Sequence, residues 1–178
     1  MPMTIRRADL GREADEIAKL LVDYLTAALR QLRETFGVED SPTDVAGVRA
    51  WLAEYGDDPG KALFVVEDTA ATRADGRLVG VAGLRTIGSG VVEVKRMYVV
   101  PECRGMRAGS RLLDRLLEEA ARLGASTVRL DTARFMADAQ RLYRSRGFAE
   151  RTPYEGTEIP AHLQQYWIFF ERGLAAQV

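Results

Sequence analysis

The chain has 178 residues, 47% of them hydrophobic, and a formal net charge of −1. This length and apolar content predict one domain, residues 1–178, with a substantial core. The small net charge excludes a general nucleic-acid or polyanion binder, because such proteins carry a basic excess.

Cysteine usage and hydropathy indicate where the protein works. The lone cysteine, Cys103, excludes an internal disulfide and fits a reducing cytoplasm. The N-terminus lacks the apolar run and cleavage site of a signal peptide, and no stretch approaches the ~20 apolar residues that span a bilayer. We therefore expect a cytoplasmic protein with no membrane or nucleic-acid partner. Cysteine and histidine form no cluster, so we expect no metal.

The first third of the chain is predicted to form a strand and two helices. The strand covers residues 3–8, and a turn at residues 9–13 leads into a long helix with apolar side chains at three- and four-residue spacing. The polar stretch 39–42 ends this helix. A shorter helix covers residues 43–55 and buries Val48, Trp51 and Leu52.

Three strands are predicted next. Residues 62–67 and 78–85 form two of them around a polar turn at residues 72–76. Residues 91–99 form the third, which Pro101 ends because proline has no N–H to give to a ladder. A helix with leucines along one face begins at Ser110.

The loop between this strand and helix, residues 104–110, has the layout of a phosphate-binding site. Free N–H groups in a first helical turn point at an anion, and the helix dipole favours negative charge there. Arg104 and Arg107 add full positive charges. The loop has neither G-x-G-x-x-G nor the Gly-Lys-Ser/Thr ending of a P-loop. Taken alone, it also fits an ordinary strand-to-helix turn.

The last third is predicted to alternate between strands and a helix. Residues 128–132 form a strand and residues 136–146 a helix that Gly147 ends. Phe148 opens another strand. After a loop, residues 165–171 form the last strand.

Two motifs resemble those of the GNAT superfamily of N-acetyltransferases. Residues 104–109, Arg-Gly-Met-Arg-Ala-Gly, resemble its signature Gln/Arg-x-x-Gly-x-Gly/Ala, and residues 139–148 resemble its pattern Ala-x-x-Leu-Tyr-x-x-x-Gly-Phe. The chain departs from the family at Arg107, where glycine is usual, and at Met136, where asparagine is common. We expect Arg107 to lie in the first helical turn with negative φ, where arginine causes no strain.

The resemblance, strongest over residues 61–173, implies an α/β fold. Its order β-α-α-β-β-β-α-β-α-β-β implies a mixed, mostly antiparallel central sheet of about seven strands with helices on both faces. The fourth and fifth strands are expected to splay apart. Residues 1–60 would supply acceptor-side helices, and residues 61–173 would form the acetyl-CoA-binding core.

The resemblance implies acetyl transfer from acetyl-CoA, the cosubstrate, to a primary amine of a small molecule or peptide. The amine would attack directly, through a tetrahedral intermediate. A homodimer could form through an exposed edge of the last strand. Two alternatives stay open: a non-catalytic acyl-CoA-binding sensor or interaction module, for which Arg107 and Met136 leave room, and an unrelated α/β nucleotide binder.

Three residues are candidates for the chemistry. Tyr143 lies where the family places a tyrosine beside the CoA sulfur and could protonate the leaving thiolate; the alternative is a core aromatic. Glu93 could take a proton from the ammonium through a water; the alternative is a solvent-facing carboxylate paired with Lys95 or Arg85. The backbone N–H of Met97, or that of Tyr98, would stabilise the oxyanion.

The resemblance also places the ligands. The acetyl-CoA-binding residues would be Met97, Tyr98, Val99, Arg104, Gly105, Met106, Arg107, Ala108, Gly109, Ser110, Met136 and Tyr143. The acceptor-binding candidates are Tyr24, Trp51, Tyr154 and His162.

Overall fold

A computed structural model gives the structure of residues 2–39, 44–56, 58–69 and 77–174. The predicted turn at residues 72–76 and most of the polar stretch 39–42 lie outside these described residues. The elements follow one another in the predicted order. They are β1 (Met3–Arg7), α1 (Leu10–Phe36), α2 (Val45–Ala53), β2 (Lys61–Asp68), β3 (Leu78–Gly88), β4 (Val91–Val99), α3 (Ala108–Arg122), β5 (Thr127–Ala133), α4 (Ala137–Ser145), β6 (Ala149–Arg151) and β7 (Trp167–Gly173), with short 3₁₀ helices at Pro101–Cys103 and Gln164–Tyr166.

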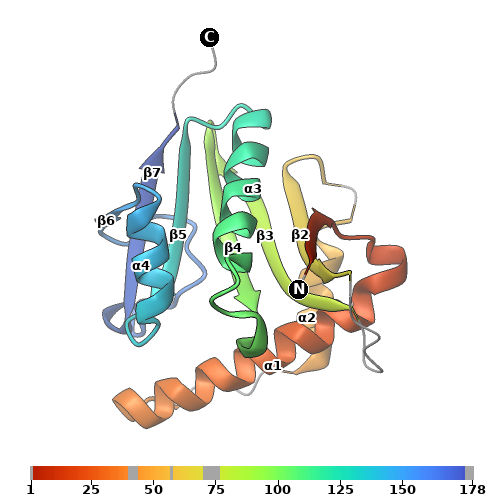
Figure 1. Ribbon diagram of the computed structural model, residues 1–178. Coiled ribbons are helices and arrows are strands. Elements are labelled where there is room, and N and C mark those ends of the chain that lie inside the picture. Colours follow the sequence, from red (N-terminus) through yellow and green to blue (C-terminus); the bar gives the residue numbers. More distant parts are fainter. Residues whose placement is uncertain (1, 40–43, 57, 70–76, 175–178) are drawn as a thin grey trace.

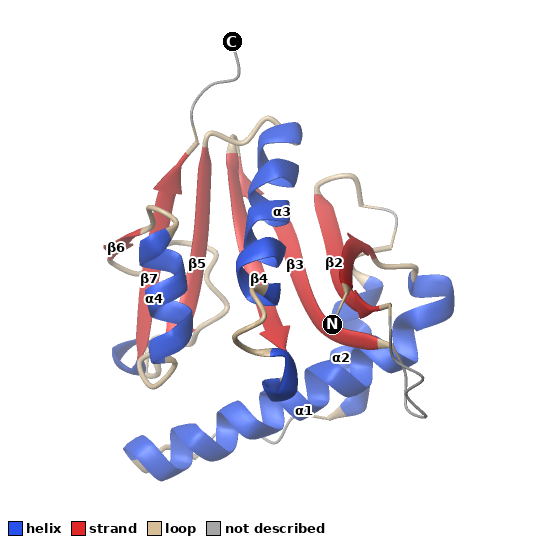
Figure 2. Cartoon of the chain, viewed as in Figure 1, coloured by secondary structure: helices blue, strands red, loops and turns tan. Residues whose placement is uncertain are grey.

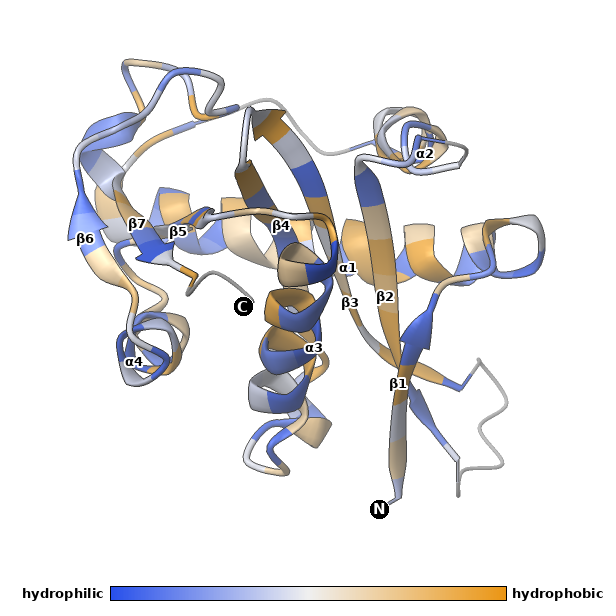
Figure 3. Ribbon diagram, turned by 90° about the horizontal axis from the view of Figure 1, so that it is seen from above, coloured by the Kyte–Doolittle hydropathy of each residue, from blue (hydrophilic) through white to orange (hydrophobic). Residues whose placement is uncertain are grey.

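Seven strands form one mixed sheet with the spatial order β1-β2-β3-β4-β5-β7-β6. Neighbouring strands are antiparallel except β4 and β5, which are parallel. Helices α1 and α2 cover one face of the sheet, and α3 and α4 cover the other (Figure 3). The prediction of an α/β fold with helices on both faces is confirmed.

Each face of the sheet has its own apolar core. On one face, α3 buries Leu112, Leu113 and Leu116 completely, together with Phe64 and Phe170 from the strands. This agrees with the leucine face predicted for that helix. On the other face, apolar residues of α1 and α2 pack on β2 and β3. Because both faces are covered, the middle of β2 is buried at five consecutive positions.

Strands β4 and β5 separate part of the way along their length. Their pairing runs from Val91↔Thr127 to Val94↔Leu130 and stops there, although both strands continue. Figure 1 shows the two strands diverging toward α1. The predicted splay is confirmed, and the second half of β4, Lys95–Val99, is paired with β3 alone.

A β-bulge marks the point where the pairing changes. Lys95 pairs with Gly83 and Tyr98 with Val81, so two residues of β4 face one residue of β3. Arg96, one of the two, has φ 50°, in the left-handed region. A bulge bends its strand and increases the local twist, which turns the end of β4 away from β5.

Two boundary predictions need correction. The last strand in sequence, β7, is not an edge, because β6 pairs with it from Ala149↔Glu171 to Arg151↔Phe169. The outermost strand on this side of the sheet is therefore β6, and the homodimer stays a prediction. Helix α3 begins at Ala108, two residues before the predicted start at Ser110. A short 3₁₀ turn, Pro101–Cys103, and then a loop connect β4 to α3 (Figure 2).

Candidate active site

Two adjoining cavities lie beside the unpaired half of β4. The smaller has a volume of about 510 Å³ and the larger about 1020 Å³. Residues from α1, β4 and the start of α4 line both of them, Tyr24 and Met97 among them. Two cavities that share lining residues along one strand offer room for two bound molecules.

The larger cavity contains the phosphate-binding loop predicted from the sequence. Its lining includes Arg104, Gly105 and the residues from Arg107 to Ser110. No side chain in the described part of the chain caps the N-terminus of α3. The first N–H groups of the helix are therefore left for a ligand, which is the arrangement that binds phosphate.

The prediction that Arg107 has a negative φ is wrong. Arg107 precedes α3 with φ 61° and ψ 11°, and Gly105 has φ 80°. The chain leaves a 3₁₀ turn at Cys103 and enters α3 at Ala108, and this short reversal uses two left-handed residues. Glycine adopts this conformation freely, whereas arginine does so at a cost of roughly 1 kcal/mol.

The end of β4 presents backbone groups to the same cavity. The N–H of Val100 donates to the carbonyl of Val79 at 2.9 Å, so the neighbouring Val99–Gly80 pair is the non-hydrogen-bonded kind. The N–H of Val99 therefore points away from β3, toward the side where β5 has diverged. Met97, Tyr98 and Val99 all line the larger cavity.

The smaller cavity has mostly apolar walls and a few polar lining residues. α1 contributes Tyr24 and Leu25. Phe135 follows β5 in the chain, and Trp167 is the first residue of β7. Its polar groups include Lys95, Arg96, Asp131 and Glu158. An apolar chamber with a few converging polar groups is typical of a small-molecule site.

Tyr143 lies in the wall of the smaller cavity. It comes from α4, is 5% exposed, and packs edge-on against Phe148. Burial raises the pKa of the Tyr143 hydroxyl above its ordinary value. The phenol therefore keeps its proton at neutral pH. Tyr143 packs in the core and also lines the cavity. Its position is therefore compatible with both predicted roles, the core aromatic and the acid.

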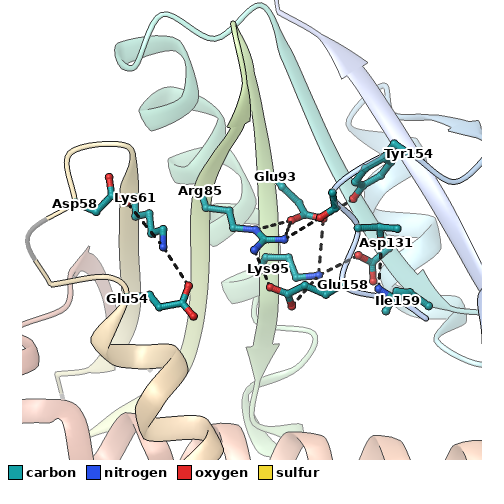
Figure 4. A network of polar contacts seen from close by, with 12 residues as sticks. Glu54, Asp58, Lys61, Arg85, Glu93, Lys95, Asp131, Tyr154, Glu158 and Ile159 are labelled. Carbon is teal, nitrogen blue, oxygen red and sulfur yellow. Dashed lines mark hydrogen bonds and ion pairs between the residues drawn. The ribbon is translucent and has the colours of Figure 1, made fainter. Parts of the chain in front are cut away.

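A polar cluster occupies the boundary between the paired and unpaired halves of β4 (Figure 4). Glu93 accepts hydrogen bonds from Arg85 Nε at 2.7 Å and from Tyr154 Oη at 2.6 Å. Lys95 Nζ lies 3.1 Å from Asp131, 3.5 Å from Glu158 and 3.8 Å from Glu93. Cations and carboxylates alternate through the cluster, as buried charges require.

Glu93 is fully buried, with no exposed surface. The expected pairing with Arg85 is present, but the idea of a solvent-facing carboxylate is wrong, because Tyr154 and Arg85 enclose it. Glu93 is absent from the lining of both cavities. Its assignment as general base stays a prediction, and the structure requires any such role to act across Lys95 or a water.

Lys95 carries a well-compensated positive charge. Burial opposes the charge, but Asp131, Glu93 and Glu158 together outweigh burial and raise the pKa of Lys95. Lys95 is therefore an ammonium at neutral pH. It holds Asp131 and Glu158 at the wall of the smaller cavity, where all three residues are found.

The structure places the predicted ligand residues unevenly. Tyr24 lines both cavities, whereas Trp51 and Tyr154 are buried outside them and His162 is exposed outside them. Of the predicted acetyl-CoA residues, Tyr143 lines only the smaller cavity and Met106, 43% exposed, lines neither. The rest lie around the larger cavity: Met97, Tyr98, Val99, Arg104, Gly105, Arg107, Ala108, Gly109, Ser110 and Met136.

Several lining residues were missed in the sequence. α1 contributes Ala28, Gln31 and Glu34 to the larger cavity, and Asp131 and Arg96 line the smaller one. The spacing of Tyr24, Ala28 and Gln31 on one helical face was a usable signal. Within the described ranges, no group of three or more histidine, cysteine, aspartate or glutamate residues could hold a metal ion. The described helices include none long and apolar enough to cross a bilayer.

Comparison with known proteins places this geometry in a family. A family model described as "Acetyltransferase (GNAT) family" matches residues 23–148. An uncharacterized N-acetyltransferase of Schizosaccharomyces pombe is 29% identical over 160 residues, covering 89% of this chain and 90% of that protein. The IAA acetyltransferase of Azospirillum brasilense is 41% identical over 83 residues, covering 46% of this chain and 54% of that protein.

A solved structure shares the fold. A Salmonella typhimurium protein, solved with its cofactor acetyl-CoA, superposes with a TM-score of 0.69 at 23% sequence identity. The match covers all of this chain and 97% of that one. At this level of identity the likeness concerns the fold alone.

Proposed function

The chain belongs to the acetyltransferase (GNAT) family, and on that premise we propose that it is an N-acetyltransferase that moves an acetyl group from acetyl-CoA to a primary amine. One observation carries the proposal: the unpaired half of β4 lies between two cavities that share Met97. The larger cavity would hold the donor and the smaller one the acceptor.

Acetyl-CoA fits the larger cavity by the chemistry of its lining. The diphosphate would lie at the uncapped N-terminus of α3, with Arg104 and Arg107 beside it. The pantetheine arm would add to β4 as an extra strand, hydrogen-bonding the backbone groups that β5 leaves unpaired. The Salmonella typhimurium structure with its cofactor acetyl-CoA supports this choice of donor.

The thioester carbonyl would then lie near Met97, where the two cavities meet. Met97 lines both cavities, whereas Tyr98 lines only the larger, so we assign the oxyanion donor to the Met97 N–H. A fixed backbone donor of this kind contributes about 3 kcal/mol to transition-state stabilisation. When the tetrahedral intermediate collapses and the C–S bond breaks, the Tyr143 hydroxyl gives its proton to the leaving thiolate.

The acceptor must lose a proton before its nitrogen can attack. Asp131 takes this role in the proposal, because it lines the smaller cavity. Glu93, predicted from the sequence, is the alternative, acting from behind Lys95. Asp131→Asn and Glu93→Gln separate the two, because only loss of the true base abolishes the acidic limb of the pH–rate profile.

The acceptor is an amine of a small molecule or a peptide. A volume of about 510 Å³ suits a small molecule or one extended side chain. A location in the cytoplasm and a homodimer stay predictions.

A thiol-release assay tests the proposal. Purified protein, acetyl-CoA and a panel of amines should release CoA thiol above the rate without amine. Acetyl-CoA binding without turnover across the panel would instead favour the acyl-CoA sensor. Thermal protection by ATP or NAD, but not by CoA, would favour the unrelated nucleotide binder.

A further inference from the structure

Two adjacent cations of β4, Lys95 and Arg96, both line the smaller cavity. Consecutive strand residues normally point to opposite faces, but the bulge at Arg96, with φ 50°, breaks that alternation. The two charges differ in their surroundings. Lys95 faces three carboxylates, whereas Arg96 has no hydrogen bond or ion pair with any described residue.

Trp51 holds the Arg96 guanidinium in place. The Arg96 Cζ atom lies 4.2 Å from the centre of the Trp51 ring, close enough for a cation–π interaction. Trp51 is itself buried and packs against Tyr55, with ring centres 4.5 Å apart. This contact places the guanidinium against the Trp51 ring while leaving its donors unused, and Nη1 is buried without an acceptor.

The position is costly for the free protein. A left-handed backbone at a non-glycine residue costs roughly 1 kcal/mol, and a buried donor without an acceptor costs roughly 1–3 kcal/mol. Burial also lowers the pKa of Arg96, and the negative charge of Glu158 only partly opposes this; a guanidinium remains protonated at neutral pH. Strained, under-satisfied groups that persist beside a cavity are typical of ligand-binding positions.

We propose that the acceptor of this site carries a carboxylate as well as its amine, and that Arg96 binds that carboxylate. This inference rests on the proposed function. The planar fork of a guanidinium matches a carboxylate and can form two parallel hydrogen bonds with it. Asp131 and Glu158, on the same cavity, suit the amine end. The acceptor class is therefore an amino-carboxylic acid with an apolar body.

Matched amines test the proposal. Leucine, leucinamide and isoamylamine form one series, and phenylalanine, phenylalaninamide and phenethylamine another. β-Alanine and γ-aminobutyrate vary the distance between the two groups. Wild-type enzyme should use at least one acid with a kcat/KM at least tenfold above that of its counterparts without a carboxylate, mainly through a lower KM.

Arg96→Gln should reduce that preference to about one, because it lowers kcat/KM for the acids at least tenfold more than for the amides. The acetyl-CoA Kd should stay unchanged, which excludes misfolding as the cause. Arg12→Gln is the matched control. Arg12 is 86% exposed and lines neither cavity, so this substitution removes the same charge outside the site. Arg96→Lys should restore part of the preference, since the charge returns without the fork.

Calorimetry with the N-acetylated acids keeps the test independent of turnover. Wild-type protein with CoA should bind them, and Arg96→Gln should bind them at least tenfold more weakly. Equal use of acids, amides and amines would overturn the carboxylate inference while the acetyltransferase proposal stood. Arg96-dependent binding of the acids with no turnover of any amine would support the carboxylate site and overturn the acetyltransferase proposal. An absence of both binding and turnover for every acid would overturn this inference.

Discussion

The two halves of β4 share one strand but have opposite surroundings. Val91–Val94 is paired on both sides, with β3 and with β5. Lys95–Val99 is paired with β3 alone and lines the cavities. The first half joins the two parts of the sheet, and the second half leaves backbone groups on its β5 side free for a ligand. One bulge, at Arg96, lets a single strand serve both purposes.

The largest expected effect concerns the open half. Tyr143→Phe removes the proposed acid from the wall of the smaller cavity without changing the volume of the side chain appreciably. We expect kcat to fall about 10²-fold, a typical contribution of general acid catalysis. The acetyl-CoA Kd, measured by calorimetry, should change less than twofold. Equal losses in kcat and in acetyl-CoA affinity would contradict the acid role.

The closed half should respond through stability. Glu93→Gln removes a fully buried carboxylate and leaves Arg85 and Lys95 with less opposing charge. We expect the free energy of unfolding to fall by about 3 kcal/mol, as when one partner of a buried ion pair is removed. Urea denaturation measures this loss. The folded fraction should keep kcat within tenfold, and a collapse of kcat with unchanged stability would make Glu93 the base.

Glu119 is a buried, paired carboxylate outside β4, and its effect on stability can be compared with that of Glu93. This α3 carboxylate is 1% exposed and accepts hydrogen bonds from Arg122, at 2.6 Å, and from Arg7. Arg122, then Arg7, lower the pKa of Glu119 to about 2. A lowered pKa stabilises the fold above about pH 4.5, and this contribution is lost as the pH falls toward 2.

Glu119→Gln should therefore cost about 1–2 kcal/mol at pH 7, a figure reduced because Arg7 and Arg122 are half-exposed. The difference from wild type should shrink by pH 3, where the native carboxylate begins to protonate. Denaturation curves at the two pH values measure this. A difference that stays constant with pH would show that shape, and not charge, makes Glu119 matter.

The smallest expected effect on stability lies at the loop after the open half. Arg107→Gly removes roughly 1 kcal/mol of left-handed strain, but glycine loses more entropy on folding, so stability should change by less than about 1 kcal/mol. The acetyl-CoA Kd should rise several-fold, and less so in high salt, because one charge near the diphosphate is lost. Arg107→Ala keeps the strain and should be the less stable variant.

The sequence predicted the order of the elements and the phosphate-binding loop, because periodicity, Pro101 and the glycines act locally. It could not predict φ at Arg107, since that angle depends on where the preceding 3₁₀ turn ends. The break in pairing after Val94 was known only from the family resemblance. Residues 91–99 form one valine-rich stretch, and their own pattern does not show where β5 departs.

The contacts within the polar cluster were the part of the site that was hardest to predict from the sequence. Glu93 meets Tyr154 across 61 positions, and Lys95 meets Asp131 across 36. Such contacts depend on the order of strands in the sheet, which no local pattern records. Arg96 escaped notice for a different reason: ordinary strand alternation would have turned it away from Lys95, and only the bulge brings both to one cavity.

Helix α1 extends for 27 residues, roughly 40 Å, and Tyr24 and Ala28 form part of the wall of both chambers. A movement of this helix that accommodates a ligand in one cavity would therefore also change the shape of the other cavity. Donor and acceptor are thus expected to change each other's affinity by the same factor.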